Sequence, residues 1–327
     1  MSQTFRTVLL QEKSNISIDY HSQILCIGSC FSENIGQLLL KHKFSILLNP
    51  FGILYNPLSI NQSLDTLLNE KEYSQRDLVF HNELWHSFDH HGRFSHPDQS
   101  TTLSLINDAI QEGYAFLKRT DYLILTCGTA YVFEQKSTGQ VVANCHKFPT
   151  KDFNRRRLTK EEITAALFPL FKRLKKVAPQ LNIILTLSPV RHIRDGLVEN
   201  QRSKATLLLA IETLEQHLDF VHYFPAYELV LDDLRDYRFF EKDMIHPNDI
   251  AIQYIWESFQ KTYFTSDTLD IYKQVQRVVK AGKHRSLYPY TKAHQQFLEK
   301  QFQKILDLEQ QYPFLNFSAE RQQFGTV

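Results

Sequence analysis

A chain of 327 residues with 43% hydrophobic residues is long enough for one large α/β domain, or for one domain with an appendage. Lysine and arginine number 37 against 36 aspartates and glutamates, so there is no electrostatic reason to expect nucleic acid or an anionic membrane as a partner. The opening MSQTFRTVLLQEKS lacks a basic segment followed by an apolar stretch, and no run approaches about 18 apolar residues. We therefore expect a cytoplasmic protein that binds neither nucleic acid nor a membrane.

Short apolar runs alternate with helical patterns along the chain. The five runs are ILCI at 24–27, SILLN at 45–49, YLILT at 122–126, IILTL at 183–187 and FVHYF at 220–224. Each is too short for a helix and mostly unbroken by polar residues, as expected for parallel strands covered on both faces. Between the runs, Thr159 and Glu162 form a capping box that marks the start of one helix. The pattern predicts a three-layer α/β domain with a five-stranded, mainly parallel sheet.

Two stretches depart from this alternation. Residues 58–118 are long enough for an insertion, and they contain the aromatic and histidine-rich ELWHSFDHHGRFSHPD, which could wall a pocket. Two amphipathic stretches at 265–327 predict a C-terminal helical hairpin that follows a domain over 1–264. One helical face of the second stretch carries apolar residues at three-to-four spacing, namely Leu298, Phe302, Ile305 and Leu306. We expect this face to pack on the domain or on a second copy, which would make a homo-oligomer.

The stretch CIGSCFSENIG, residues 26–36, joins the first expected strand to a helix. Ligands bind beyond the carboxyl ends of the strands in an open parallel sheet, which is where this stretch lies. Gly28 supplies a tight turn, and the unpaired amides of the helix start face the side chain of Ser29 or Cys30. Either side chain could be a nucleophile. The same letters also fit a structural turn in which Ser32 caps the helix.

A second motif, EKDMIHPND, follows the last expected strand and places Asp243 three residues before His246. Histidine is the usual general base near neutral pH. A nearby carboxylate can fix its tautomer and stabilise the imidazolium. An early nucleophile and a late Asp–His pair together predict a site for nucleophilic catalysis.

Several ordered motifs resemble those of the GSCFA family, which is placed with the SGNH or GDSL-type hydrolases. The motifs are IGSCFSENIG, NPFGILYNP, CGTAYVF, SPVRH and DMIHPN. The resemblance covers roughly residues 1–260, and the tail is similar to the extension of other GSCFA proteins. It implies a flavodoxin-like, SGNH hydrolase-like sheet with a serine-esterase type of site.

The resemblance also implies roles for individual residues. An SGNH enzyme opens with Gly-Asp-Ser, and laying this motif on IGSC puts Cys30 at the nucleophile and Ser29 at the aspartate. Cys30 is therefore the favoured nucleophile and Ser29 the alternative. The late pair of the family falls on Asp243 and His246. Gly28 supports the turn beneath the nucleophile.

The oxyanion donors implied by the family are only partly present. Gly52 matches the glycine donor, whereas Gly128, Thr129 and Ala130 stand where the pattern has Gly-x-Asn. Loss of one side-chain donor typically raises the barrier by about 2.7 to 4 kcal/mol. The Thr129 hydroxyl is the candidate substitute.

Other conspicuous residues have both a functional and a structural interpretation. Candidate substrate-binding residues are Arg191 and His192, which could bind a carboxylate or phosphate, Asn200 and Lys204 at a helix start, and Trp85 and His86 in the insertion. A surface turn, a polar helix start and ordinary core packing would account for the same residues. The histidines near position 90 have neither a nearby cysteine nor helical spacing, so we expect no metal and no cofactor.

We therefore predict an SGNH-like hydrolase or acyltransferase that acts on an O-acyl ester of a glycan or small metabolite. The alternative is a binding or scaffold protein that retains the fold without catalysis, because the Asn donor is missing. A catalytic Cys30 should exist partly as thiolate near neutral pH, stabilised by His246 and the helix amides. The distance between Cys30 and His246 in a water-accessible pocket separates the two hypotheses.

Overall fold

The computed structural model describes residues 7–10, 12–284 and 286–325. The chain divides into two compact units. The larger comprises residues 23–36 and 46–257 with the residues before position 11, and the smaller comprises residues 11–22, 37–45 and 258–327. Within the described residues, no helix is both long and apolar enough to cross a bilayer.

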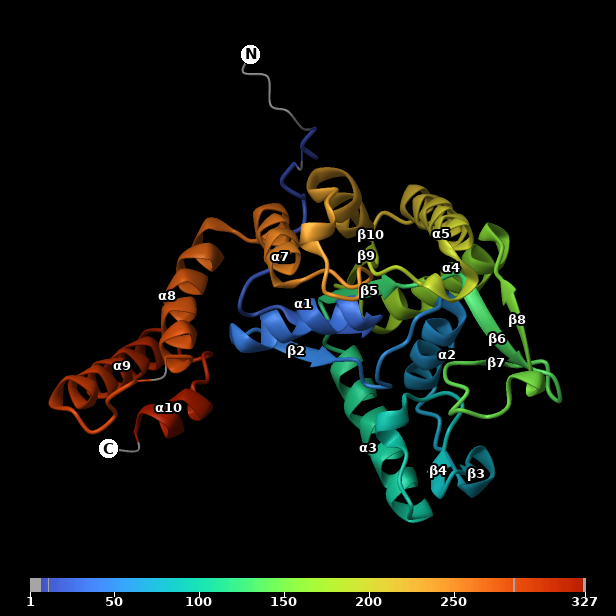
Figure 1. The fold of residues 1–327 in the computed structure, drawn as a ribbon, viewed down its shortest axis with the longest axis horizontal. Coiled ribbons are helices and arrows are strands. Elements are labelled where there is room, and N and C mark those ends of the chain that lie inside the picture. The colour runs from blue at the N-terminus through green and yellow to red at the C-terminus, as the bar shows by residue number, and fades with distance from the viewer. Residues whose placement is uncertain (1–6, 11, 285, 326–327) are drawn as a thin grey trace. The chain divides into compact units, whose positions relative to one another are not determined.

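A five-stranded sheet in the order β10-β9-β5-β1-β2 is the centre of the fold (Figure 1). Its strands are β1 (Gln23–Gly28), β2 (Ser45–Leu48), β5 (Tyr122–Cys127), β9 (Asn182–Leu187) and β10 (Val221–Phe224). The pairs β1/β5, β5/β9 and β9/β10 are parallel. All five expected strands are confirmed. The inner strands β1, β5 and β9 are almost completely buried, as expected for strands covered on both faces, whereas the edge strands β2 and β10 are partly exposed.

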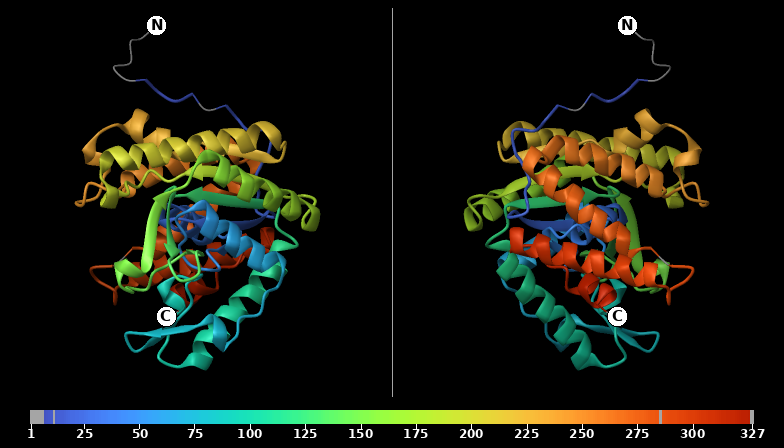
Figure 2. Two further views of the ribbon diagram at one scale, coloured as in Figure 1. Left: turned by 90° about the vertical axis from the view of Figure 1, so that its right-hand side faces the viewer. Right: turned by 90° about the vertical axis from the view of Figure 1, so that its left-hand side faces the viewer.

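Helices lie on both faces of this sheet (Figure 1 and Figure 2). Leu25 and Ile27 of β1 belong to a core cluster with residues of α2, α3, α4 and α5. Ile24 and Cys26 point to the opposite face and are also fully buried. The main helices are α1 (Cys30–Lys41), α2 (Pro57–Leu68), α3 (Gln99–Leu117), α4 (Lys160–Val177), α5 (Leu197–His217) and α7 (Asp249–Tyr263). The three-layer α/β class is therefore confirmed.

Two smaller β structures interrupt the alternation of strands and helices. The expected insertion holds α2, α3 and an antiparallel hairpin of β3 (Val79–His81) and β4 (Leu84–His86). A three-stranded antiparallel sheet of β6 (Tyr131–Gln135), β7 (Val141–Val142) and β8 (Phe153–Arg157) lies between β5 and α4. Short segments that follow β10 are α6 (Ala226–Glu228) and a π-helix (Leu229–Leu234). The sheet of β6 to β8 was not expected from the sequence.

The capping box at the start of α4 is confirmed. The Glu162 amide donates to Thr159 Oγ1 at 3.2 Å, and the Thr159 amide donates to Glu162 Oε2 at 2.8 Å. Two backbone donors that the helix start leaves unpaired are satisfied in this way. Helix α4 thus begins at the position indicated by the sequence.

In the described part of the smaller unit three helices follow residue 265, where the sequence predicted a two-helix hairpin. They are α8 (Ser266–Gly282), α9 (Lys292–Gln311) and α10 (Ser318–Phe324). Within this unit, Lys43 Nζ pairs with Glu320 Oε2 at 2.7 Å. On α9, Ile305 is fully buried but Leu306 is 39% exposed. The prediction that Leu306 belongs to the apolar face of this helix was therefore wrong. The buried face runs through Ile305 and Leu308, and a position one residue away points about 100° elsewhere.

Candidate functional site

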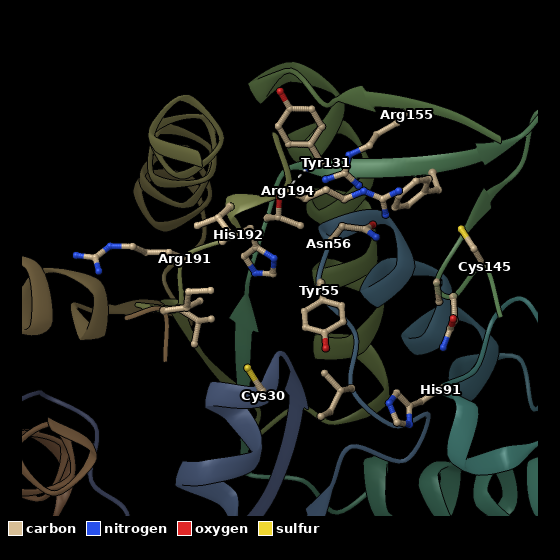
Figure 3. A pocket seen from close by; sticks show the side chains of 18 of the residues that line it. Cys30, Tyr55, Asn56, His91, Tyr131, Cys145, Arg155, Arg191, His192 and Arg194 are labelled. Atoms are coloured by element: carbon tan, nitrogen blue, oxygen red, sulfur yellow. Dashed lines mark hydrogen bonds between the residues drawn. The ribbon is translucent and has the colours of Figure 1, made fainter. Parts of the chain in front are cut away.

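A cavity of about 570 Å³ lies at the carboxyl ends of the central strands (Figure 3). Its lining side chains come from the start of α1, the loops after β2, β5 and β9, the sheet of β6 to β8, and the turn before α7. This is the edge of a parallel sheet at which ligands bind. All of the lining residues belong to the larger unit.

Gly28 ends β1 in a conformation that only glycine adopts readily, with φ at +143°. A Cβ on this residue would lie 2.2 Å from the carbonyl oxygen of Thr126 on β5. The Gly28 amide donates to Asn49 Oδ1 at 3.0 Å. The turn that carries the candidate nucleophile is therefore built on close contact between β1 and β5, as its expected support role requires.

Ser29 and Cys30 have different surroundings. The Ser29 side chain is completely buried, and its Oγ accepts the Phe31 amide at 3.3 Å, so Ser29 caps α1 in place of Ser32. Cys30 is the first residue of α1, is partly exposed and lines the cavity, whereas Ser29 is not among the lining residues. Of the two candidate nucleophiles, Cys30 is the one whose side chain reaches the cavity.

Burial is the largest influence on the Cys30 thiol, and it raises the pKa of this group. The amides of Cys30 and Phe31 and the ammonium of Lys204 act in the opposite direction but do not outweigh burial. The expected thiolate near neutral pH is therefore wrong for this structure. The helix start does favour the anion, as predicted, but desolvation of a sulfur in this cavity disfavours it more.

His246 and Asp243 form a pair on a surface turn. His246 Nδ1 lies 2.7 Å from Asp243 Oδ2, and the amides of Ile245 and His246 donate to Asp243 Oδ1 at 2.9 and 3.0 Å. The His246 amide, the His246 ring and the Ile245 amide together lower the pKa of Asp243 to about 2. Because an ionised carboxylate only accepts, Nδ1 carries the hydrogen and Nε2 of the neutral ring is an acceptor.

Cys30 and His246 line the same cavity. Among the described residues, no hydrogen bond joins the Cys30 thiol to the His246 ring. The structure thus brings the two groups into one cavity.

The two glycines expected to support an oxyanion use their amides within the fold. The Gly52 amide donates to the Asn49 carbonyl at 2.7 Å, and the Gly128 amide donates to the Tyr55 carbonyl at 2.8 Å. Gly52 adopts a φ of +77° in a turn after β2, which directs its amide back into that turn. Neither amide is available to a bound substrate in this arrangement, contrary to the expectation for Gly52.

Thr129 lines the cavity. Its Oγ1 accepts the Tyr131 amide at 3.1 Å and lies 3.1 Å from Ser203 Oγ, which in turn accepts the Ala130 amide at 2.7 Å. When the Ser203 hydroxyl donates to Thr129 Oγ1, the Thr129 hydroxyl can donate its own hydrogen to another acceptor. Ser203 on α5 thus holds Thr129 and Ala130 in place.

Lys204 is buried and joins the ends of two strands. Its Nζ donates to the carbonyls of Gly128, after β5, and Ser188, after β9, at 2.7 and 2.6 Å. Burial lowers the pKa of Lys204 to about 7. Asn200 is also buried, and its Oδ1 accepts the His192 amide at 2.9 Å. Both residues shape the site, but neither lines the cavity as a substrate-binding residue would.

Arg191 and His192 do line the cavity. Arg191 Nη1 donates to the Met244 carbonyl at 2.9 Å, and its guanidinium lies 4.1 Å from the centre of the Phe240 ring. His192 meets the Tyr55 ring edge-on at 5.6 Å. Burial lowers the pKa of His192 to about 3, so its ring is neutral at ordinary pH.

Two family models match the sequence. The model of the GSCFA family matches residues 23–259, and that of the GSCFA domain protein C-terminal domain matches residues 275–326. The chain belongs to the GSCFA family. In this GSCFA protein the first match includes every strand of the central sheet and every residue of the cavity lining.

Other comparisons add less. Among solved structures, the GSCFA protein is similar to an acetyl xylan esterase, Est2A, from the rumen bacterium Butyrivibrio proteoclasticus, with a TM-score of 0.32 and 13% identity. The alignment covers 75% of this chain and 64% of that chain. A likeness of this size carries no argument about activity. The search of curated proteins found no match to the GSCFA protein.

Trp85 and His86 of the GSCFA protein do not line the cavity. Both lie in β4, where Trp85 packs against the main core. His86 Nδ1 lies 2.7 Å from Ser95 Oγ, and its Nε2 lies 3.0 Å from the His81 carbonyl oxygen. Their polar atoms and ring surfaces thus hold the insertion together. The residues that the structure describes contain no cluster of three or more His, Cys, Asp or Glu side chains suited to a metal ion.

The sequence analysis missed several residues of the GSCFA site. Tyr55 lines the cavity, and its pKa is raised first by burial and then by repulsion from Cys30 when that thiol is ionised. Asn49, at a φ of +47°, holds the amides of both Gly28 and Gly52 in place. Its position in NPFG was the available signal, because asparagine tolerates this conformation better than most residues. Arg155 and Arg194 also line the cavity, and nothing in their sequence surroundings distinguishes them from ordinary surface arginines.

Proposed function

We propose that this GSCFA protein is a hydrolase or acyltransferase that acts on an O-acyl ester of a glycan or small metabolite. Cys30 is the nucleophile, His246 the general base and acid, and Asp243 the group that orients the histidine. The observation that supports this most is that Cys30, on the first turn of α1, and His246, held by Asp243, line one cavity. The family of the chain favours the same chemistry.

The first step is transfer of the Cys30 proton. Because burial raises the pKa of Cys30, the resting group is the thiol and a base must remove its proton. His246 Nε2 accepts this proton, and Sγ attacks the acyl carbon to form a carbon–sulfur bond. The pair must therefore approach more closely in the substrate complex than in the free protein, as is common for catalytic hydrogen bonds.

The oxyanion that forms needs donors, and three groups at the cavity are candidates. They are the Cys30 amide at the start of α1, the Thr129 hydroxyl and the Tyr55 hydroxyl. No hydrogen bond among the described residues uses the Tyr55 hydroxyl. A hydroxyl donor in place of the missing asparagine amide would recover part of the stabilisation that the family pattern provides.

The remaining steps return the enzyme to its starting state. The carbon–oxygen bond breaks as His246 Nε2 gives its proton to the leaving alkoxide, and a thioester remains on Cys30. Water, or an acceptor hydroxyl in a transferase, then attacks the thioester and gives its proton to His246. The bond between the acyl carbon and the sulfur breaks, and the Cys30 sulfur takes that proton back from the His246 ring, so that the free enzyme is restored.

Hydrolysis of para-nitrophenyl acetate by the wild type and by Cys30→Ala, His246→Ala and Ser29→Ala tests this proposal. We expect turnover and an acetylated Cys30 by peptide mass in the wild type, and neither in Cys30→Ala. Ser29→Ala should keep most of the activity and lose about 1 kcal/mol of stability, because it removes a helix cap. Wild-type turnover by Cys30→Ala, or loss of all turnover in a folded Ser29→Ala protein, would overturn the assignment.

A binding or scaffold role is the second candidate. The engaged amides of Gly52 and Gly128 favour it, because they leave fewer preformed donors for an oxyanion. In that case acyl esters bind to the wild type and to Cys30→Ala with equal affinity, and neither protein turns them over.

A further inference from the structure

The cavity has an unbalanced set of charges. Three arginines and three histidines line it, and its lining contains neither aspartate nor glutamate. Burial lowers the pKa of both His91 and His192, so these rings carry no charge at neutral pH. The positive charge of the lining therefore resides mainly on its arginines: Arg155, Arg191 and Arg194.

Arg155 is neutralised by the protein itself. Its Nε donates to Asp195 Oδ1 at 2.7 Å, and its Nη2 contacts the other carboxylate oxygen. This bidentate contact is the main reason for the lowered pKa of Asp195. The Arg155 guanidinium also lies 4.5 Å from the centre of the Phe133 ring. Arg155 thus fixes the wall of the cavity and leaves little charge for a ligand.

Arg194 helps to lower the pKa of the neighbouring Asp195 but forms no ion pair of its own among the described residues. The structure pairs Arg194 with no acidic side chain in the part of the chain that it describes, because the oxygens of the adjacent Asp195 are bonded to Arg155. Its guanidinium lies 4.9 Å from the centre of the Phe133 ring. Stacking on an aromatic ring restrains the guanidinium plane while its N–H edge stays available.

Arg191 also lines the cavity, but its guanidinium extends away from Arg194 (Figure 3), and the same residue lines a neighbouring pocket with Asp232 and Asp236. One of its nitrogens donates to the Met244 carbonyl, and the ring of Phe240 lies against its guanidinium. Arg194 is therefore the arginine of the lining whose charge is left for a ligand of this cavity.

The charges and the candidate nucleophile lie on different sides of the space. Figure 3 shows the guanidinium groups of Arg155 and Arg194 beside Tyr131, with Cys30 on the opposite side and Tyr55 between. A ligand that places an ester at Cys30 would extend toward the arginines. Planar guanidinium groups bind carboxylate and phosphate oxygens with two parallel hydrogen bonds.

We propose that the substrate of this site carries an oxyanion, a carboxylate or a phosphate, on the part of the molecule remote from the reacting acyl group, and that Arg194 binds it. This inference rests on the proposed function, since it places the ester at Cys30. It narrows the substrate to acyl esters of an anionic alcohol.

Binding to the Cys30→Ala protein tests the anion site without any turnover. Titration calorimetry compares methyl para-hydroxybenzoate, which is neutral, with para-hydroxybenzoate and para-hydroxyphenyl phosphate. We expect at least one of the two anions to bind about tenfold or more tightly than the neutral ligand, since hydrogen bonds between charged groups are worth this much. The anion with the larger preference identifies the carboxylate or the phosphate as the natural group.

Variants in the same background locate the charge that is responsible. Arg194→Ala should remove most of the anion preference. Arg194→Lys should keep part of it, because an ammonium retains the positive charge but cannot form the two parallel hydrogen bonds of a guanidinium. The matched control is Arg202→Ala, since Arg202 is exposed, pairs with Glu199 and does not line the cavity. Equal binding of neutral and anionic ligands, or equal losses in Arg194→Ala and Arg202→Ala, would overturn the proposal.

Turnover of para-acetoxybenzoate by the wild type separates this inference from the proposed function. An Arg194-dependent anion preference in a protein without esterase activity would support the anion site and refute the catalytic assignment. Esterase activity through Cys30 without any such preference would do the reverse.

Discussion

Replacing the buried Lys204 with methionine should change how the stability of the protein depends on pH. Burial lowers the pKa of Lys204 from its usual 10.5 to about 7. Between these values the unfolded chain binds a proton that the folded protein does not, so the free energy of unfolding rises with pH. The slope is about 1.4 kcal/mol per pH unit, which gives about 2 kcal/mol between pH 7.5 and 9.

Urea unfolding followed by circular dichroism at several pH values in this range measures the slope directly. Methionine has no proton to exchange, so Lys204→Met should lack this part of the rise. The variant should also be less stable overall at pH 9, because the carbonyls of Gly128 and Ser188 lose their donor. Lys176→Met, which changes an exposed lysine of α4, is the control and should keep the wild-type slope. Parallel pH profiles for the wild type and Lys204→Met would refute the reasoning.

Three further predictions concern the turn after β1 and the surface pair. Gly28→Ala should cost about 3 kcal/mol or more, because the new Cβ would lie 2.2 Å from the Thr126 carbonyl oxygen, and an unchanged urea midpoint would contradict this. Iodoacetamide should label Cys30 before the buried cysteines of β1 and β5, with a rate that keeps increasing above pH 8 because burial raises the pKa of Cys30. Peptide mapping measures this rate, and a labelling rate of Cys30 that levelled off near neutral pH would contradict the prediction. Asp243→Asn should lower ester turnover by up to about 10⁴-fold with little change in stability, and steady-state kinetics at wild-type levels would exclude its orienting role.

The central sheet could be predicted from the sequence because its inner strands β1, β5 and β9 are covered on both faces and so form unbroken apolar runs, and its edge strands β2 and β10 are also mainly apolar. The sheet of β6 to β8 could not, because its strands are short and only partly buried. The segment FNRRR of β8 illustrates this, since Arg155, Arg156 and Arg157 each pair with an acidic side chain that only the fold brings near. A run of arginines in sequence reads as a solvated segment, and its partners lie far along the chain.

The candidate site was predictable in part for a similar reason. The motifs located Cys30 and His246, and both line the cavity. The pattern could not indicate that Lys204 is buried, because a lysine near the start of a helix is usually on the polar face. Its burial depends on two strand ends, at Gly128 and Ser188, that present their carbonyls to the same point. The expected thiolate failed because sequence motifs carry no measure of desolvation.

The two residues of the candidate catalytic pair, Cys30 and His246, lie on structural elements of different rigidity. Cys30 follows a turn in which Gly28 is in close contact with a central strand, so its position can change little without disturbing the sheet. His246 stands on a surface turn, which hydrogen bonds from Arg191 to the carbonyls of Met244 and Ile245 attach to the loop after β9. Substitutions within that turn can alter the separation of thiol and imidazole while the core stays intact. The reactivity of Cys30 and the thermal stability of the protein should therefore be separately adjustable.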